Sequence, residues 1–521
     1  MRKRVVLRGI VVLYLVIGLV PVLSLPIGSV RVDGHFSFEA YRELLNSRRQ
    51  WILMGHSMAL SSLVALLTVL VGTPLGLLFG KTDLPFRRVF VALFAAPLLI
   101  PSYVVAVAWS DMLGGLLGEE ASGWLFSLPG CVAVLFTVYL PIPMVLTMVF
   151  LRTIDPALEE AGRLVCGWRC VLKGIVLPLI APAILLSGML VFILCFGEVG
   201  VPGFLRYDVY AVESFTRFSA FYDARSAVVM AIPLMLAPAI LLGVEAFLLR
   251  DKTAWMRPDP KIAQSMVAPL GAFRWAFLAA VILLGLATVV LPVTALAVQS
   301  SGLAVYREAI DRAGDSLFRG VLYAGAGATL LTVFGFFIGY LIQTRALRSW
   351  RLIDTATIFL FALPGAVMGM GLITGWNRSW SDFIYSTPVI IILGYLAKYT
   401  ALTSRITVAR MARIPPSMEE AARIAGASWP RRMGLIVAPL AWRALAAGWI
   451  TGYVFSLRDT GMTMLVYPPG HDTLVVRIYT LMANGAPELI AALCILMMII
   501  SLLPSGMLWA MSGIPRRKAA R

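Results

Sequence analysis

Charged side chains are scarce in this sequence. Asp, Glu, Lys and Arg make up only 14% of the 521 residues, whereas hydrophobic residues make up 60%. A typical soluble domain is about 25% charged, and a chain this apolar cannot hide its side chains in a water-surrounded core. The composition therefore excludes a soluble protein and predicts an integral membrane protein.

Histidine and cysteine are also rare. The three histidines, His35, His56 and His471, stand apart without partners, which argues against a membrane enzyme such as a lipid-modifying transferase. We therefore expect no catalytic residues and no enzymatic activity. The five cysteines fall in apolar segments or in a repeated polar loop and imply no disulfide framework. Cys166 and Cys170 are four residues apart but lack the further ligands of a metal site, so no metal is expected.

Long apolar runs are what the sequence has in abundance. A helix needs about 20 residues to cross about 30 Å of hydrocarbon. Windows of that length lie near 10–30, 53–80, 89–113, 129–151, 178–204, 227–249, 273–299, 318–343, 353–376, 385–404, 440–457 and 487–511. The first follows a basic N-terminus, as in a signal peptide, but it is too long and lacks a small-residue exit, so we expect an uncleaved span. The predicted fold class is all-α, with twelve transmembrane helices.

Basic residues set the predicted orientation. The formal net charge is +17, but Lys and Arg stand in short runs between apolar segments, which indicates membrane topology and not a nucleic-acid surface. If the N-terminus is cytoplasmic, 30 of the 44 Lys and Arg residues lie in cytoplasmic segments and 13 lie outside. The positive-inside rule therefore places both termini in the cytoplasm.

The two halves of the sequence repeat each other. Matched residues recur at a nearly constant separation: Gly72 with Gly335, Gly76 with Gly339, and Pro101 with Pro364. We expect a first half at residues 1–260 and a second at residues 261–521, with six spans each. An even number of spans gives both halves one orientation, so they form parallel repeats about an axis along the membrane normal, where a substrate path is expected. The glycine spacing suits close helix packing.

A short polar passage occurs once in each half. Residues 155–178 read DPALEEAGRLVCGWRCVLKGIVLP, and residues 415–439 read PPSMEEAARIAGASWPRRMGLIVAP. Each copy predicts a short helix, a turn that glycine permits, and a second helix that leads into the next span. The charge count places both copies in the cytoplasm. The first copy is one residue shorter, so the two turns need not dock equally tightly.

The second copy resembles the EAA loop of permease subunits of binding-protein-dependent ABC importers. The resemblance implies a coupling helix that docks in a cleft of a separate ATPase. The residues to which it assigns docking are Glu159, Glu160, Ala161, Gly162 and Gly167 in the first copy and Glu419, Glu420, Ala421, Ala422 and Gly426 in the second. The alternative is an amphipathic interfacial loop without a partner.

Over nearly its full length the sequence resembles fused permeases of the ferric-iron and thiamine type. This implies a type I importer fold in the bacterial inner membrane, two copies of a cytoplasmic ATPase, a periplasmic binding protein and alternating access. We expect no cofactor in this chain. Residues 76–82 come close to a phosphate-binding loop, but Leu75 stands where its first glycine is required and no strand precedes it. ATP is therefore expected on the partner.

Two acidic residues match across the halves near the outer ends of their spans, Glu198 in FGEVG and Asp459 in LRDTG. A carboxylate at the bilayer centre costs about 2.5 to 3.5 kcal/mol, so it normally faces a bundle interior, a wet cavity or a cation. We hypothesise that the pair lies on the translocation pathway and meets a cationic cargo. The alternative is that the two pair with Arg458 or Arg206, or reach interfacial water.

Arg217 and Arg477 match in the outward loops. They are candidates for pairing with acidic residues of the binding protein. A structural role at the lipid headgroups is the alternative. The neighbouring His471 and Asp472 have no spacing that defines a catalytic or metal site.

The sequence leaves cargo and energy source open. Ferric iron is the first candidate, from the resemblance and weakly from the two carboxylates; thiamine, another small cation and an organophosphorus solute are the others. An ion-coupled secondary transporter also fits six plus six spans. Such a carrier would be expected to place ionisable residues well inside its spans, and it needs no doubled docking loop.

Overall fold

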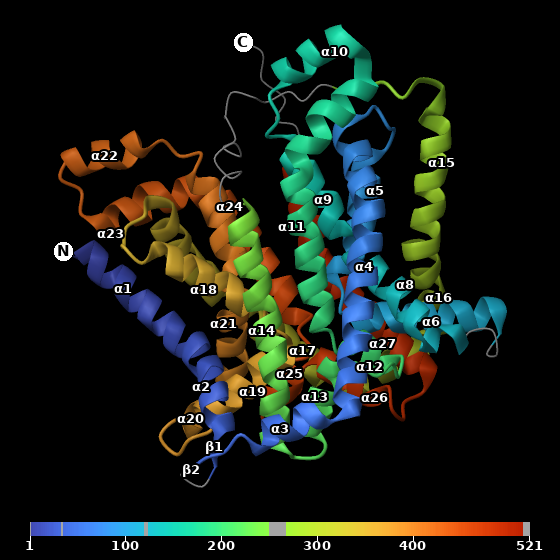
Figure 1. Ribbon diagram of the computed structural model, residues 1–521, viewed down its shortest axis with the longest axis vertical. Coiled ribbons are helices and arrows are strands. Elements are labelled where there is room, and N and C mark those ends of the chain that lie inside the picture. The colour runs from blue at the N-terminus through green and yellow to red at the C-terminus, as the bar shows by residue number, and fades with distance from the viewer. Residues whose placement is uncertain (1, 33–34, 119–122, 250–266, 514–521) are drawn as a thin grey trace. The chain divides into compact units, whose positions relative to one another are not determined.

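A computed structural model describes residues 2–32, 35–118, 123–249 and 267–513. Over these residues the fold is helical, apart from one two-stranded sheet and one isolated bridge (Figure 1). Ten described helices are long and apolar enough to cross a membrane, and up to twelve spans result when each of two bent helix pairs counts as one. The prediction of an all-α fold with many membrane spans is confirmed.

Residues 39–299 form one compact unit. Its elements are α3 Glu39–Asn46, α4 Arg48–Lys81, α5 Arg87–Ala95, η2 Ala96–Leu99, α6 Ser102–Leu117, η3 Gly123–Phe126, α8 Leu128–Tyr139, α9 Pro141–Leu151, α10 Pro156–Val171, η4 Leu172–Val176, α11 Leu177–Phe196, α12 Gly200–Phe204, α13 Tyr210–Ser219, α14 Ala224–Leu249, η6 Gly271–Phe273, α15 Arg274–Gly285, η7 Leu286–Val290 and α16 Leu291–Gln299. Helices α4, α9 and α11 pack on one another at its centre.

Residues 1–38 and 300–521 form the other unit. Its elements are α1 Arg2–Tyr14, η1 Leu15–Leu19, α2 Val20–Val30, β1 Arg31–Val32, β2 His35–Phe36, α17 Leu303–Thr344, α18 Trp350–Ala362, α19 Gly365–Trp376, α20 Asp382–Tyr385, α21 Val389–Met411, α22 Pro416–Ile424, α23 Trp429–Arg432, η8 Met433–Val437, α24 Ala438–Leu457, α25 Thr463–Val466, α26 Leu474–Leu481 and α27 Pro487–Gly513. Strands β1 and β2 pair antiparallel, and α17, α21 and α24 form the centre.

The compact units do not follow the predicted halves of the chain. Residues 1–38 pack with the second half, because the Tyr14 hydroxyl donates to the Ala397 carbonyl at 3.2 Å and Gly18 lies against the same residue. In the other direction, Leu278 and Val281 of α15 join a buried apolar cluster with residues of α4, α5 and α9. Each half therefore contributes its first span to the unit of the other half. The boundary predicted near residue 260 lies outside the described residues.

The matched glycines allow close helix packing in both units. A Cβ at Gly76 of α4 would lie 2.6 Å from the Met144 carbonyl oxygen of α9. A Cβ at Gly339 of α17 would lie 2.7 Å from the Ser404 carbonyl oxygen of α21. Distances this short leave no room for a side chain, so the two helix pairs meet backbone to backbone, as the spacing predicts.

Two predicted spans are sharply bent at matched prolines. The windows near 89–113 and 353–376 are each broken into two helices, by 108° before Ser102 and by 110° before Gly365. Pro101 and Pro364 are the N-cap residues of the helices that follow. Proline lacks the amide hydrogen that a continuous helix uses, and it disfavours the helical conformation in the residue before it. Each bend places the start of a new helix, α6 or α19, in the interior of its unit.

Candidate functional site

The first polar loop is built on α10, which lies beyond the end of α11 (Figure 1). The Asp155 carboxylate accepts a hydrogen bond from the Ala157 amide at 2.9 Å, which satisfies one of the free donors at the helix start. Gly167 has φ +71°, a left-handed conformation that glycine adopts without steric cost. The chain turns there and continues into the span Gly167–Phe196. The helix, turn and helix expected for this passage are present.

The two glutamates of the first loop have opposite environments. Glu159 forms an ion pair with Lys81, the last residue of α4, with 2.6 Å between Nζ and Oε1. The side chains of Lys81 and Glu159 are 3% and 0% exposed, so the pair is fully buried. Glu160, the next residue, is exposed. Of the two predicted docking glutamates, only Glu160 is open to a partner, while Glu159 holds the loop against its own unit.

The second polar loop consists of α22 and α23, joined at Gly426. Gly426 has φ +82°, so here too a left-handed glycine makes the turn. Trp429, the first residue of α23, is buried against the rings of Phe337 and Tyr340 on α17, with centroid distances of 6.1 and 6.4 Å. These contacts fix the second arm of the loop to the unit that contains it.

The glutamates of the second loop repeat the division seen in the first. Glu419 accepts a hydrogen bond from the Tyr340 hydroxyl at 2.9 Å and lies 3.5 Å from Arg432 Nε. Tyr340 in turn accepts a hydrogen bond from Lys3 of α1 at 2.8 Å. Glu420 is exposed. The inner glutamate is thus anchored in both loops, although by different partners, and the outer glutamate faces solvent.

The exposed faces of the two loops match residue by residue. Each presents a glutamate, an alanine and, four residues after the glutamate, a large apolar side chain: Glu160, Ala161 and Leu164 in the first loop, and Glu420, Ala421 and Ile424 in the second. Leu164 is 89% exposed and Ile424 84%. The sequence analysis did not single out these two side chains. An apolar residue four positions after a glutamate lies on the same face of a helix, so this pattern could have indicated them. The other predicted residues, Gly162 and Ala422, are half-buried.

Cysteine chemistry differs from expectation in the first loop. Cys170 is disulfide-bonded, so the expectation that the sequence forms no disulfide is wrong at this position. That expectation rested on the position of the cysteines in apolar segments and in the repeated loop, which says nothing about local thiol geometry. Cys131, Cys195 and Cys494 are buried and form no disulfide. Among the described residues, no group of three or more His, Cys, Asp or Glu is arranged to hold a metal ion.

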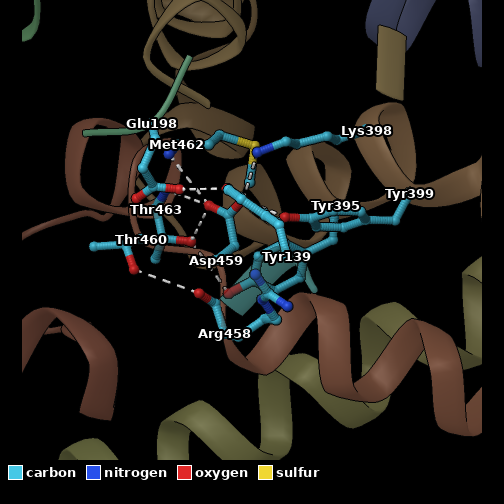
Figure 2. Close-up of polar contacts among 10 residues, drawn as sticks. All are labelled: Tyr139, Glu198, Tyr395, Lys398, Tyr399, Arg458, Asp459, Thr460, Met462 and Thr463. Carbon is cyan, nitrogen blue, oxygen red and sulfur yellow. Dashed lines mark hydrogen bonds and ion pairs between the residues drawn. The ribbon is translucent and has the colours of Figure 1, made fainter. Parts of the chain in front are cut away.

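Asp459 is enclosed by donors within its unit (Figure 2). Its carboxylate accepts hydrogen bonds from Lys398 Nζ at 2.8 Å, Tyr399 Oη at 2.5 Å and the Thr463 amide at 3.0 Å, and it is 4% exposed. Burial raises the pKa of Asp459, but the Lys398 ammonium and these hydrogen bonds outweigh burial, so the pKa lies below its usual value. The ion-pair partner is Lys398 and not Arg458, as one alternative supposed.

Among the described residues, Glu198 is held only by neutral donors. Its carboxylate accepts hydrogen bonds from Ser102 Oγ at 2.7 Å, Tyr139 Oη at 2.9 Å and the Gly200 amide at 2.9 Å. Within the described part of the chain, no ion pair joins Glu198 to a lysine, arginine or histidine, and Arg206 is therefore not its partner. The side chain is half-buried.

Comparison with known proteins identifies the class of this chain. Residues 324–510, which include α21, the second polar loop and Asp459, match the family described as binding-protein-dependent transport system inner membrane component. Over residues 324–510 the chain therefore has the membrane domain of a permease of this kind. With its several apolar helices the permease is a multi-pass membrane protein, and its second polar loop lies within the matched residues.

The permease is similar to ferric transport permeases over most of its length. It is 24% identical over 467 residues to the putative ferric transport system permease protein FbpB 1 of Haemophilus influenzae, covering 82% of this chain and 72% of that protein. It is 24% identical over 462 residues to the ferric transport system permease protein FbpB of Actinobacillus pleuropneumoniae, covering 82% and 66%. A match of 145 residues at 26% identity, to the spermidine/putrescine transport system permease protein PotC of Escherichia coli, covers 28% and 48%. The permease therefore spans less than three quarters of each of these relatives.

The two matched arginines, Arg217 and Arg477, differ in whether an acidic side chain neutralises them. Arg217 Nε donates to Glu213 at 3.0 Å, and its guanidinium lies 3.8 Å from Asp223. Arg477 donates to the Arg312 carbonyl at 3.3 Å, and no ion pair of Arg477 occurs among the described residues. Of the two predicted contacts for a binding protein, Arg477 forms no ion pair among the described residues, whereas Arg217 is paired with acidic side chains of its own loop.

Proposed function

We propose that this permease is the transmembrane subunit of an ATP-driven importer that takes ferric iron from a periplasmic binding protein and releases it into the cytoplasm by alternating access. The observation that carries the proposal is the doubled loop, with one anchored and one exposed glutamate in each copy. Two equal surfaces suit two copies of one partner. The partner is a cytoplasmic ATPase, which binds and hydrolyses the ATP in place of this chain.

The permease architecture in this proposal is two parallel six-helix repeats with cytoplasmic termini. Matched contacts support the repeat, because the glycines of α4 and α17 meet carbonyls in the same way and the bends before α6 and α19 agree within 2°. The positive-inside bias supports the orientation. Glu198 and Asp459 then lie at the outer ends of their spans, and the polar loops lie at the inner ends.

Ferric iron is the cargo that the comparisons favour. The two relatives that match over most of this chain are ferric transport permeases by name, whereas the polyamine permease matches only 28% of it. Iron(III) is a hard cation and prefers oxygen ligands. Glu198, with the Tyr139 and Ser102 hydroxyls beside it, supplies oxygen atoms of that kind.

Co-purification with the ATPase tests the docking proposal. Replacing Glu160 and Glu420 together with arginine places two cations where the partner meets two carboxylates, and we expect the ATPase to be lost from the purified complex. Glu488→Arg, at an exposed glutamate outside both loops, is the matched control and should retain it. Retention by the double variant would contradict the proposal.

Transport in proteoliposomes tests the energy source and the cargo. With binding protein, ATPase and permease present, radioactive ferric iron should accumulate with ATP and fail to accumulate with a non-hydrolysable analogue. Uptake that follows an imposed ion gradient without ATP would instead establish a secondary transporter. Uptake of thiamine or of a phosphonate in place of iron would retain the importer and replace its cargo.

A further inference from the structure

The two matched carboxylates, Glu198 and Asp459, have similar surroundings in their two halves. Tyr139 donates to Glu198 at 2.9 Å, and Tyr399 donates to Asp459 at 2.5 Å, from matched positions of the two halves. Each carboxylate also lies beside the start of the helix after a bend. Ser102, the first residue of α6, bonds Glu198 directly. Around Asp459 the corresponding helix start is α19, whose first residue packs against Met462 and Gly461.

The surroundings of the two carboxylates differ at two positions, and together these differences decide whether a lysine reaches the carboxylate. Tyr399 is preceded by Lys398, which neutralises Asp459, whereas Tyr139 is preceded by the buried Val138. The start of α19 is Gly365, where a Cβ would lie only 3.1 Å from Lys398 Nζ. The matching residue at the start of α6 is Ser102. The second half thus combines a lysine with the glycine that makes room for it, and the first half has neither.

The two carboxylates therefore differ in whether a neighbouring cation neutralises them. Asp459 and Lys398 together carry no net charge and are nearly closed to solvent, with side-chain exposures of 1% and 13%. Glu198 has no such charged partner, because only neutral groups contact its half-buried carboxylate among the described residues. A carboxylate in such surroundings attracts a cation, because no fixed positive charge of the protein competes for it.

We propose that Glu198 alone is the cation-contacting carboxylate of the pathway, with the Tyr139 and Ser102 hydroxyls as its neighbouring oxygen ligands. Asp459 is a structural residue that closes the equivalent place in the second half. This inference rests on the proposed import function, and it adds that the pathway is electrostatically one-sided although the two halves are repeats. A trivalent cation released from the binding protein therefore contacts the first half of the chain.

The test transplants the second-half arrangement into the first half. Val138→Lys with Ser102→Gly recreates the lysine and the glycine, so the new ammonium reaches Glu198 as Lys398 reaches Asp459. Val138→Met with Ser102→Gly is the matched control, because it has similar bulk and no charge. In proteoliposomes with binding protein and ATPase, we measure radioactive ferric iron accumulated per ATP hydrolysed. Both double variants lack the Ser102 hydroxyl and differ only in the charge at residue 138. The ratio of the lysine variant should therefore lie about tenfold below that of the methionine variant, and Glu198→Gln should lower the ratio about tenfold relative to the unaltered permease, as expected for loss of one charged contact.

The same assay separates the inference from its alternatives. A structural role of Glu198 would lower binding-protein-stimulated ATP hydrolysis and iron uptake together, leaving their ratio unchanged in Glu198→Gln, and would overturn the inference. A lysine variant with the same ratio as the methionine variant, and with normal ATP hydrolysis, would also overturn it. If the unaltered permease fails to accumulate iron with its binding protein, the proposed function fails instead. Glu198→Asp, which keeps the charge, should recover most of the ratio.

Discussion

Replacing Lys81 with methionine tests whether the buried ion pair holds the first polar loop in place. Lys81 and Glu159 are 3% and 0% exposed, with 2.6 Å between the charged atoms. Removing one partner of a buried pair costs about 3 to 5 kcal/mol, because the remaining charge is left uncompensated. Since about 1.4 kcal/mol is a factor of ten, Lys81→Met should favour release of the loop from α4 by about a hundredfold or more. Release lets Glu159 reach water.

Trypsin cleavage of the loop in the purified permease measures that release. Arg163 and Arg169 are exposed on α10, and cleavage after either residue should be much faster in Lys81→Met than in the unaltered protein. Lys173→Met is the control, because Lys173 is an exposed lysine of the same passage. Lys81→Met combined with Glu159→Leu removes both charges and should return cleavage towards the original rate. A double variant as sensitive as Lys81→Met, or a Lys81→Met variant as resistant as the unaltered protein, would refute the reasoning.

Three further outcomes are expected. Gly76→Ala forces a Cβ against a carbonyl and should lower the stability of the permease by about 1 to 3 kcal/mol in thermal unfolding. Gly243→Ala should not, because a Cβ there has nothing within 4 Å. Equal effects of the two substitutions would contradict the packing argument. Gly426→Ala, at φ +82°, should cost about 1 to 2 kcal/mol and weaken ATPase co-purification, and unchanged binding would exclude a role for this turn. Lys398→Met should destabilise the permease at neutral pH, because the buried Asp459 carboxylate then lacks its cation. Without that cation the pKa of Asp459 is raised, so protonation removes the unpaired charge and the loss of stability should become smaller as pH falls. A loss of stability that grows with acid would exclude this account.

The spans and the helix–turn–helix form of the two polar loops could be predicted because their signals are local. Apolar windows of sufficient length indicate membrane helices wherever they occur, and a polar passage with glycine between two such windows indicates a surface turn. The positions of the two bends could be predicted from the sequence, but their angles could not. Pro101 and Pro364 mark places where a helix cannot continue unchanged, but an angle of more than 100° depends on what packs against the second segment.

The remaining features depend on contacts between residues far apart in sequence. Glu159 and Glu160 are neighbours with the same side chain, and only the position of Lys81 beside α10 buries the first and leaves the second exposed. Lys398 falls in the apolar window 385–404, and nothing in that window shows that it pairs with an aspartate 61 residues further along the chain. The pairing of residues 1–38 with the second half could not be read from hydropathy, because two apolar helices look alike whichever unit they join.

That exchange of first spans affects how the protein is made. Tyr14 bonds the carbonyl of a residue 383 positions later. At ribosomal rates of about 5 to 20 residues per second, the first span waits roughly 20 to 80 seconds before its final neighbour is synthesised. A chain cut within residues 250–266 would leave this span without its unit, and would leave α15 attached to the wrong fragment. Fusing the two halves therefore does more than ensure equal numbers, because it keeps the first span covalently attached to the unit that it joins.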